Sequence, residues 1–208
     1  MQRLLLLLLP VVVTMFSAAV FAAEPQAIFE DKFEGKLAEG WIWLRENPGA
    51  WRLKDGALEI RVEPGGGSNV KNALVRKAPD RSRETLVVEV TVANNTAPTN
   101  QYEQAGITWY CKGEPVFKLV KERVDGELCI IPGKVPMTSQ TVQLRLIVTA
   151  GTFKAQFRPD GKGEFRTAAE GKLPAPDDDQ VSIQCYNGPP DAEHWIRFDD
   201  FRILRLDE

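Results

Sequence analysis

The stretch LVVEVTV, residues 86–92, decides the fold class. Leucine and valine occupy every second position in it, and Glu89 and Thr91 lie between them. Apolar side chains that recur with a period of two share one face of an extended chain, and the side chains between them point to the opposite face. The pattern predicts a β-strand with one face in a hydrophobic core and the other face outside it.

The same alternation recurs in four further segments, 107–111, 144–148, 153–157 and 181–185. Turn signals that end in glycine separate such runs, namely KDG at 54–56, VDG at 124–126, TAG at 149–151 and PDG at 159–161. Asp-Gly pairs favour tight hairpins. No segment shows the 3.6-residue apolar spacing of an amphipathic helix. Many short antiparallel strands predict an all-β fold, a two-sheet antiparallel β-sandwich or jelly roll.

Residues 1–22 have the pattern of a cleaved signal peptide. An apolar run follows Arg3, and Val20 and Ala22 stand where a signal peptidase prefers small residues. We expect cleavage before Ala23, a secreted or periplasmic location, and no transmembrane anchor in the mature chain.

The mature chain, residues 23–208, is expected to be a single domain because its longest linker-like segment is EPGGGS at 63–68. Its charge argues against a nucleic-acid partner, since the whole chain carries −3 and phosphates demand a basic face. The single histidine, His194, excludes metal sites built from several histidines, and we expect it on the surface or at the start of a strand.

The chain has three cysteines, so at most one disulfide can form within it. A two-residue turn at Asp125-Gly126 would place Glu122 opposite Cys129. Cys111 would then lie near the opposite end of the 116–122 strand, too far from Cys129 for a disulfide. Cys111 and Cys185 share the core-facing positions of two similar strands. A Cys111–Cys185 disulfide therefore stays open beside the alternative that all three are small buried thiols.

Several motifs together resemble a known superfamily. They are, in order, FEDKFEG at 29–35, GWIW at 40–43, ENPG at 46–49, WRLKDGALEI at 51–60, QAGI at 104–107, FKLVKE at 117–122 and RFDDFRI at 197–203. The sequence is similar to the concanavalin A-like lectin/glucanase superfamily, above all to the jelly-roll domain at the C-terminus of family 43 β-xylosidases and to related secreted stand-alone domains. The resemblance implies a curved sandwich, neighbouring N- and C-terminal strands, and a concave sheet that carries any carbohydrate site.

Polar side chains opposite the core are the candidate ligand-binding residues: Tyr110, Lys118, Glu122, Arg145, Gln156, Gln184 and Tyr186. If their sheet is concave and uncovered, we expect them to project into one groove. Aromatic rings suit the C–H faces of sugars, and amides and charges suit their hydroxyls. The alternative is a solvated sheet face with cross-strand ion pairs such as Lys118 with Glu122.

The carboxylates yield a metal hypothesis and no catalytic residue. Asp31 and Asp199 fall in matching phenylalanine-flanked motifs, and on neighbouring strands their oxygens could hold a structural Ca²⁺. The alternative is that Asp199 pairs with Arg197 or Arg202. No strand carries the closely spaced glutamates of the catalytic glucanases. The aspartates at 177–179 are expected to be a solvated loop run.

These observations favour a secreted carbohydrate-binding or recognition module whose partner is an oligosaccharide or polysaccharide and which has no catalysis of its own. Two alternatives stay open. One is a glycoside-acting enzyme of the same fold, similar to 3-keto-disaccharide hydrolases or to glucanases. The other is a protein-interaction module of the cell envelope, in which the concave face meets another protein.

Overall fold

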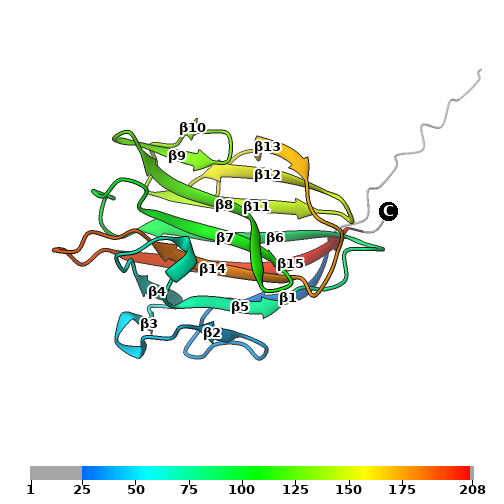
Figure 1. Cartoon of the computed structure of the whole chain (residues 1–208), viewed down its shortest axis with the longest axis horizontal. Coiled ribbons are helices and arrows are strands. Elements are labelled where there is room, and N and C mark those ends of the chain that lie inside the picture. Colours follow the sequence, from blue (N-terminus) through cyan, green and yellow to red (C-terminus); the bar gives the residue numbers. More distant parts are fainter. Residues whose placement is uncertain (1–24, 207–208) are drawn as a thin grey trace, which may run out of the picture.

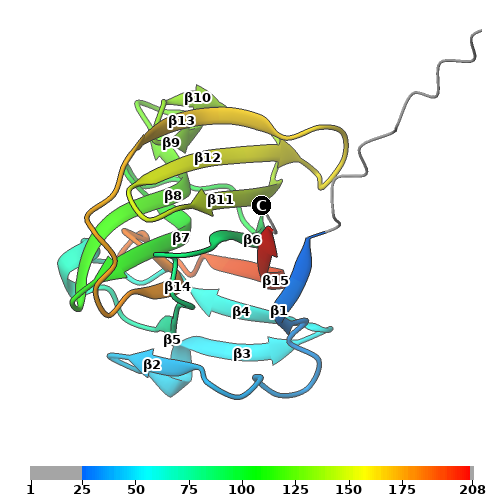
Figure 2. The same cartoon turned by 90° about the vertical axis from the view of Figure 1, so that its right-hand side faces the viewer.

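The computed structural model describes residues 25–206, so the predicted signal peptide at 1–22 lies outside the described residues. Two antiparallel sheets pack face to face in this part of the chain (Figures 1 and 2). The helical elements described are two short 3-10 turns, η1 (Pro48–Ala50) and η2 (Gly67–Asn69). Between residues 25 and 206, no helix is long and apolar enough to cross a membrane. The all-β prediction is confirmed.

The first sheet, here called sheet A, has eight strands in the order β13-β12-β11-β6-β15-β4-β3, with β1 paired to β15. Its strands are β1 (Gln26–Asp31), β3 (Trp51–Lys54), β4 (Ala57–Arg61), β6 (Thr85–Asn94), β11 (Thr141–Val148), β12 (Thr152–Pro159), β13 (Arg166–Lys172) and β15 (Trp195–Leu206). Since β1 runs antiparallel to β15, the N- and C-terminal strands are neighbours, as the resemblance implied (Figure 2).

The second sheet, sheet B, has seven strands in the order β10-β9-β8-β7-β14-β5-β2. Its strands are β2 (Ile42–Leu44), β5 (Ala73–Lys77), β7 (Gln104–Cys111), β8 (Glu114–Val124), β9 (Glu127–Ile131), β10 (Val135–Pro136) and β14 (Gln180–Tyr186). The central strands β8, β7 and β14 form the part of this sheet that positions the candidate site.

The LVVEVTV stretch lies within β6, between β11 and β15 in sheet A. Leu86, Val88, Val90 and Val92 are fully buried in the core between the sheets. Glu89 is fully buried as well, but on the outer face of the sheet, where arginine side chains pair with it. The alternation therefore predicted the direction of each side chain, although not the burial of the outer one.

Asp-Gly turns reverse the chain where they were expected. Asp55-Gly56 joins β3 to β4, and Asp125-Gly126 joins β8 to β9. In each turn both central residues have positive φ, 50° and 69° in the first and 53° and 86° in the second. This conformation matches the right-handed twist of the flanking strands, and Asp and Gly tolerate it better than most residues.

All three cysteines are free and buried, so the Cys111–Cys185 disulfide is wrong. The register pairs Cys185 with Ala105, six residues along β7 from Cys111. At ~3.4 Å per residue the two cysteines lie about 20 Å apart along the sheet, far beyond bridging distance. The expected pairing of Glu122 with Cys129 is confirmed.

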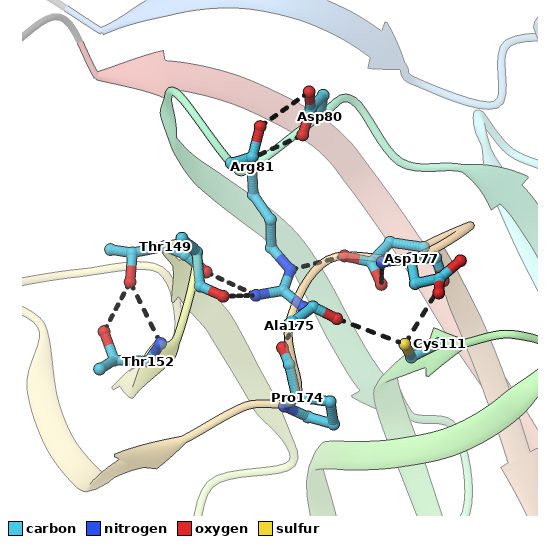
Figure 3. Close-up of polar contacts among 11 residues, drawn as sticks. Asp80, Arg81, Cys111, Thr149, Thr152, Pro174, Ala175 and Asp177 are labelled. Carbon is cyan, nitrogen blue, oxygen red and sulfur yellow. Dashed lines mark hydrogen bonds and ion pairs between the residues drawn. The ribbon is translucent and has the colours of Figure 1, made fainter.

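A buried arginine ties together three loops at one end of the sandwich (Figure 3). The Arg81 side chain is 0% exposed, and its Nε lies 2.5 Å from Asp179 Oδ2. Its terminal nitrogens donate to the carbonyls of Thr149 (2.6 Å), Ala150 (2.8 Å) and Pro174 (2.8 Å). Asp179 is thus a buried ion-pair partner, and the expectation that the whole 177–179 run is solvated is wrong for this residue.

Candidate functional site

A groove of about 510 Å³ runs over the outer face of sheet B. Its polar residues are Thr108, Lys118, Gln184 and Tyr186, which alternate along β7, β8 and β14 with residues of the core. Its apolar residues come mainly from β8 and from the end of β9, namely Pro115, Val116, Phe117, Ile131 and Pro132. Gly67 and Ser68 of η2 complete the lining, so that a polar floor lies beside apolar walls.

Strand pairing arranges the outer-face side chains in rows across the sheet, and two of these rows have a polar side chain on each of the three central strands. One row crosses β8, β7 and β14 as Lys118, Thr108 and Ser182. The other row contains Glu122, Gln104 and Tyr186 in the same order. Opposite residues of an antiparallel pair have Cβ atoms about 5 Å apart, so each row brings its side chains into mutual contact.

The amide of Gln184 is held in a fixed orientation. Its Oε1 accepts hydrogen bonds from Tyr110 Oη at 3.0 Å and from Ser182 Oγ at 2.9 Å. Two hydroxyls occupy the carbonyl end of the amide, so the Nε2 end is the one left for a ligand. Within residues 25–206, Nε2 makes no hydrogen bond, and it is not one of the polar atoms that are buried without a partner. Burial raises the pKa of Tyr110, so its hydroxyl stays a proton donor.

Lys118 anchors the other side of the floor. Its Nζ donates to Gln104 Oε1 at 2.7 Å and to Glu122 Oε2 at 3.0 Å. Gln104 is itself held by a 2.8 Å bond from its Nε2 to the carbonyl of Tyr102. Lys118 and Glu122 therefore form the expected ion pair, although within β8 and not between two strands. The pair and the bond to Gln104 leave one of the three ammonium N–H groups without a partner among these residues.

Two further groups complete the floor. Tyr186 packs against Val70, Ala73 and Val75 on the outer face, and burial together with the nearby Glu122 carboxylate raises its pKa to about 12. Thr108 is 3% exposed, and its Oγ1 is buried with no hydrogen-bond partner in the described part of the chain. Such an orphaned hydroxyl is unusual in a folded protein because it costs ~1–3 kcal/mol.

Five of the seven predicted ligand residues therefore lie together on sheet B. The other two, Arg145 and Gln156, are corrected by the structure, because they face each other on β11 and β12 at the outer face of sheet A. There Arg145 forms an ion pair with the buried Glu89 and stacks on Phe165. The period-two pattern assigns a side chain to a face of its strand, but it does not say which sheet the strand joins.

Asp31 and Asp199 do not fit a calcium site. Both oxygens of Asp31 accept N–H bonds, Oδ1 from Phe33 and Oδ2 from Ala38 and the Trp41 indole, at 2.7 to 2.9 Å. Asp199 forms an ion pair with Arg197 at 3.3 Å, as the alternative interpretation predicted. Its Oδ1 accepts a hydrogen bond from the backbone N–H of Asp200. Calcium needs several oxygens free to coordinate. Within residues 25–206, no three Asp, Glu, His or Cys residues gather in a metal-holding group.

The sequence did not single out Gln104, Thr108 or Ser182. All three occupy the outer-face positions of the same strands as Tyr110 and Gln184, so the period-two rule was a sufficient signal for them. His194 precedes β15 directly, as expected, but it is buried and its Nδ1 lies 2.7 Å from Glu103 Oε1. No local pattern predicts that partner, because the two residues are 91 positions apart.

No protein-family model matches the sequence, and no curated protein matches it either. Among solved structures, a xylan β-1,4-xylosidase from Bacillus halodurans superposes with a TM-score of 0.70 at 17% identity, covering 91% of this chain and 41% of that one. The fold is the concanavalin A-like jelly roll. The GH43 protein BlXynB from Bacillus licheniformis shows the same jelly roll with a TM-score of 0.65 at 19% identity, over 84% of this chain and 39% of that one.

An alginate lyase from Corynebacterium sp. has the jelly roll over more of its own length. Its TM-score is 0.53 at 10% identity, with 76% of this chain and 82% of that chain covered. The chain spans about two fifths of the length of the xylosidase and of the GH43 protein. At these identities the likeness shows the fold alone.

Proposed function

We propose that the groove on sheet B binds a carbohydrate and that the protein is a recognition module without catalysis of its own. The observation that carries the proposal is the floor itself, in which Gln184, Lys118 and Tyr186 are held in place between apolar walls. Preorganised polar groups bind without an ordering cost, since their orientations are set before the ligand arrives.

The two kinds of surface match the two kinds of surface on a sugar. Hydroxyl groups require donors and acceptors, which the floor supplies. The C–H faces require apolar contact, which Val116, Ile131 and Pro132 offer; Val116 is 36% exposed. The similar solved structures also support this ligand class, because one is a xylosidase and another an alginate lyase.

Binding is favoured over hydrolysis by the placement of the carboxylates. Glycoside hydrolysis ordinarily needs two of them facing each other across the scissile bond. Of the described residues, no Asp or Glu lines the groove. Glu122, which lies in the neighbouring row, is buried and bound to Lys118.

Export is part of the same proposal, with the mature chain starting at Ala23. The thiols suit an oxidising compartment, because burial raises the pKa of Cys111, Cys129 and Cys185 and so keeps them in the unreactive protonated form. The N-terminal residue of the protein recovered outside the cytoplasm checks this: a chain that retains Met1 there would contradict cleavage.

The test is a glycan array on the chain from Ala23 onward, followed by affinity measurements on Gln184→Ala and Gln156→Ala. These two glutamines lie on opposite sheets, so Gln156→Ala is a matched control. We expect Gln184→Ala to weaken binding at least about tenfold and Gln156→Ala to leave it unchanged, since removing one partner of a ligand hydrogen bond costs ~1–3 kcal/mol and ~1.4 kcal/mol is tenfold in affinity. No binding to any glycan would overturn the proposal, and release of shortened products would overturn its non-catalytic part.

A further inference from the structure

Two cationic side chains lie at or near the groove of a protein that is acidic overall. Lys118 lines the groove, and Arg45 is bonded to Val70, which packs against the groove residue Tyr186. The chain has a net charge of −3. Near the floor, Glu122 is bound to Lys118, so this pair is close to neutral. Arg45 adds an uncompensated charge: it is exposed, its Nε donates to the carbonyl of Val70 at 2.6 Å, and its field acts on the Tyr110 hydroxyl. Arg45 has no carboxylate partner within residues 25–206.

The free hydrogen-bonding groups of the floor are N–H donors on Gln184 and Lys118 and the hydroxyls of Thr108 and Tyr186, which can donate or accept. The Oε1 of Gln184 is saturated by two hydroxyls, which leaves its Nε2 for a ligand. Lys118 uses two of its three N–H groups inside the protein. The acceptor that would balance them, Glu122, does not line the groove.

We infer that the ligand is an acidic glycan, one in which a sugar carries a carboxylate. The inference rests on the proposed function and names its ligand class. A neutral hydroxyl both donates and accepts, and within the groove lining only the hydroxyls of Thr108, Tyr186 and Ser68 are side-chain groups that could accept from it. A carboxylate only accepts, and its hydrogen bonds from an amide or an ammonium are charge-assisted and about twice as strong as neutral ones.

The charge of Arg45, unlike that of the paired Lys118, adds to this preference. Charge complementarity raises the association rate and disfavours partners of the wrong sign, and both effects weaken as salt screens the charges. Binding of an acidic glycan is therefore expected to lose affinity between 0.05 M and 0.5 M salt, whereas binding of a neutral glycan is expected to change little.

The experiment compares a polygalacturonate oligomer with its carboxyl-reduced form, which keeps the same backbone and length, by calorimetry on the chain from Ala23 onward. We expect the acidic oligomer to bind at least about tenfold more tightly, in a salt-dependent manner. Equal affinities, or binding of only neutral glycans on the array, would overturn this inference and leave the proposed function standing. Absence of binding to every glycan would overturn the proposed function itself.

Two variants place the effect in the groove. Arg45→Gln removes the free charge at an exposed position, and Gln184→Glu gives the floor a carboxylate of the same size as the amide. Both are expected to weaken binding of the acidic oligomer at least about fivefold; Arg45→Gln should spare neutral oligomers, whereas Gln184→Glu also removes the Nε2 donor and should weaken them as well. The matched control is Arg166→Gln, which removes an exposed arginine from sheet A. If Arg166→Gln weakens binding as much as Arg45→Gln, the preference comes from net charge and the inference is wrong.

Discussion

The end of the sandwich around Arg81 and the floor of the sheet B groove are both clusters of buried polar side chains, but they are completed differently. Arg81 uses four of its five N–H groups on Asp179 and three loop carbonyls, and it is fully buried (Figure 3). The groove floor leaves donors on Gln184 and Lys118 without partners among the described residues, and it leaves Thr108 Oγ1 orphaned.

The Arg81 cluster therefore stabilises the fold, whereas the groove floor has polar groups available to a ligand. A buried polar network that satisfies its own groups contributes order and has nothing left to offer. A floor that holds a buried, unsatisfied group, as this one holds Thr108 Oγ1, costs stability in the free protein, and it recovers that cost when a ligand supplies the partner. The comparison predicts that mutations in the two clusters change stability in opposite directions.

Arg81→Met should have the largest effect. It leaves the Asp179 carboxylate buried without its partner and removes hydrogen bonds to the carbonyls of Thr149, Ala150 and Pro174. Breaking a buried ion pair from one side costs ~3–5 kcal/mol, and we expect a loss of that order in urea unfolding. The double variant Arg81→Met/Asp179→Asn should recover part of it. A loss below about 1 kcal/mol would show that the network does not hold this end of the sandwich.

Lys121 is a buried charge that has a hydrogen-bond partner but, unlike Arg81, no ion pair within residues 25–206. It faces the interior from β8, its Nζ donates to the carbonyl of Gln140 at 2.8 Å, and burial lowers its pKa from 10.5 to about 8. The unfolded chain therefore binds more protons than the folded protein between pH 8 and 10.5, so this group's contribution to stability is poorest below pH 8 and improves as the pH rises through that window.

Lys121→Met should accordingly stabilise the protein at pH 7 by up to about 3.5 kcal/mol. A pKa lowered from 10.5 to about 8 corresponds to ~1.4 kcal/mol for each of about 2.5 pH units, less the cost of leaving the Gln140 carbonyl without its donor. The advantage should shrink towards pH 10.5. Unfolding midpoints of both proteins across this range measure it, with the exposed Lys162→Met as control. A difference that stays constant with pH would mean that the burial of an ammonium group is not its cause.

The features of the molecule that depend on a few neighbouring residues were predictable from the sequence. The alternation in residues 86–92 and the Asp-Gly turns predicted strands and hairpins because both signals act over a few residues. The side-chain directions of Lys118, Gln184 and Tyr186 followed from the same period.

Contacts between distant segments were not predictable in this way. Arg145 was misplaced because sheet membership depends on the pairing of β11 with β6, more than 50 residues away along the chain. Asp179 meets Arg81 across 98 residues, and nothing around either residue distinguishes a buried partner from a solvated charge. Both errors concern long-range pairing, which no local period encodes.

Thr108→Val should change the free energy of unfolding least, and whether the change is a gain or a loss is the most informative result. Valine has nearly the shape of threonine, so the change removes the orphaned Oγ1 without opening a cavity, and we expect a gain of about 1 kcal/mol in the absence of ligand. The control Thr91→Val, at a half-buried position on sheet A, should stay within ~0.5 kcal/mol of the parent's stability.

Thermal unfolding of the three proteins with and without a saturating glycan completes the test. If the hydroxyl is kept for a ligand, the gain should disappear when the groove is filled, because the parent then satisfies the hydroxyl and the variant has nothing to satisfy. A variant that is less stable than the parent without ligand would show that Thr108 already has a partner, and the contrast between a completed and an open polar cluster would fail at its most specific residue.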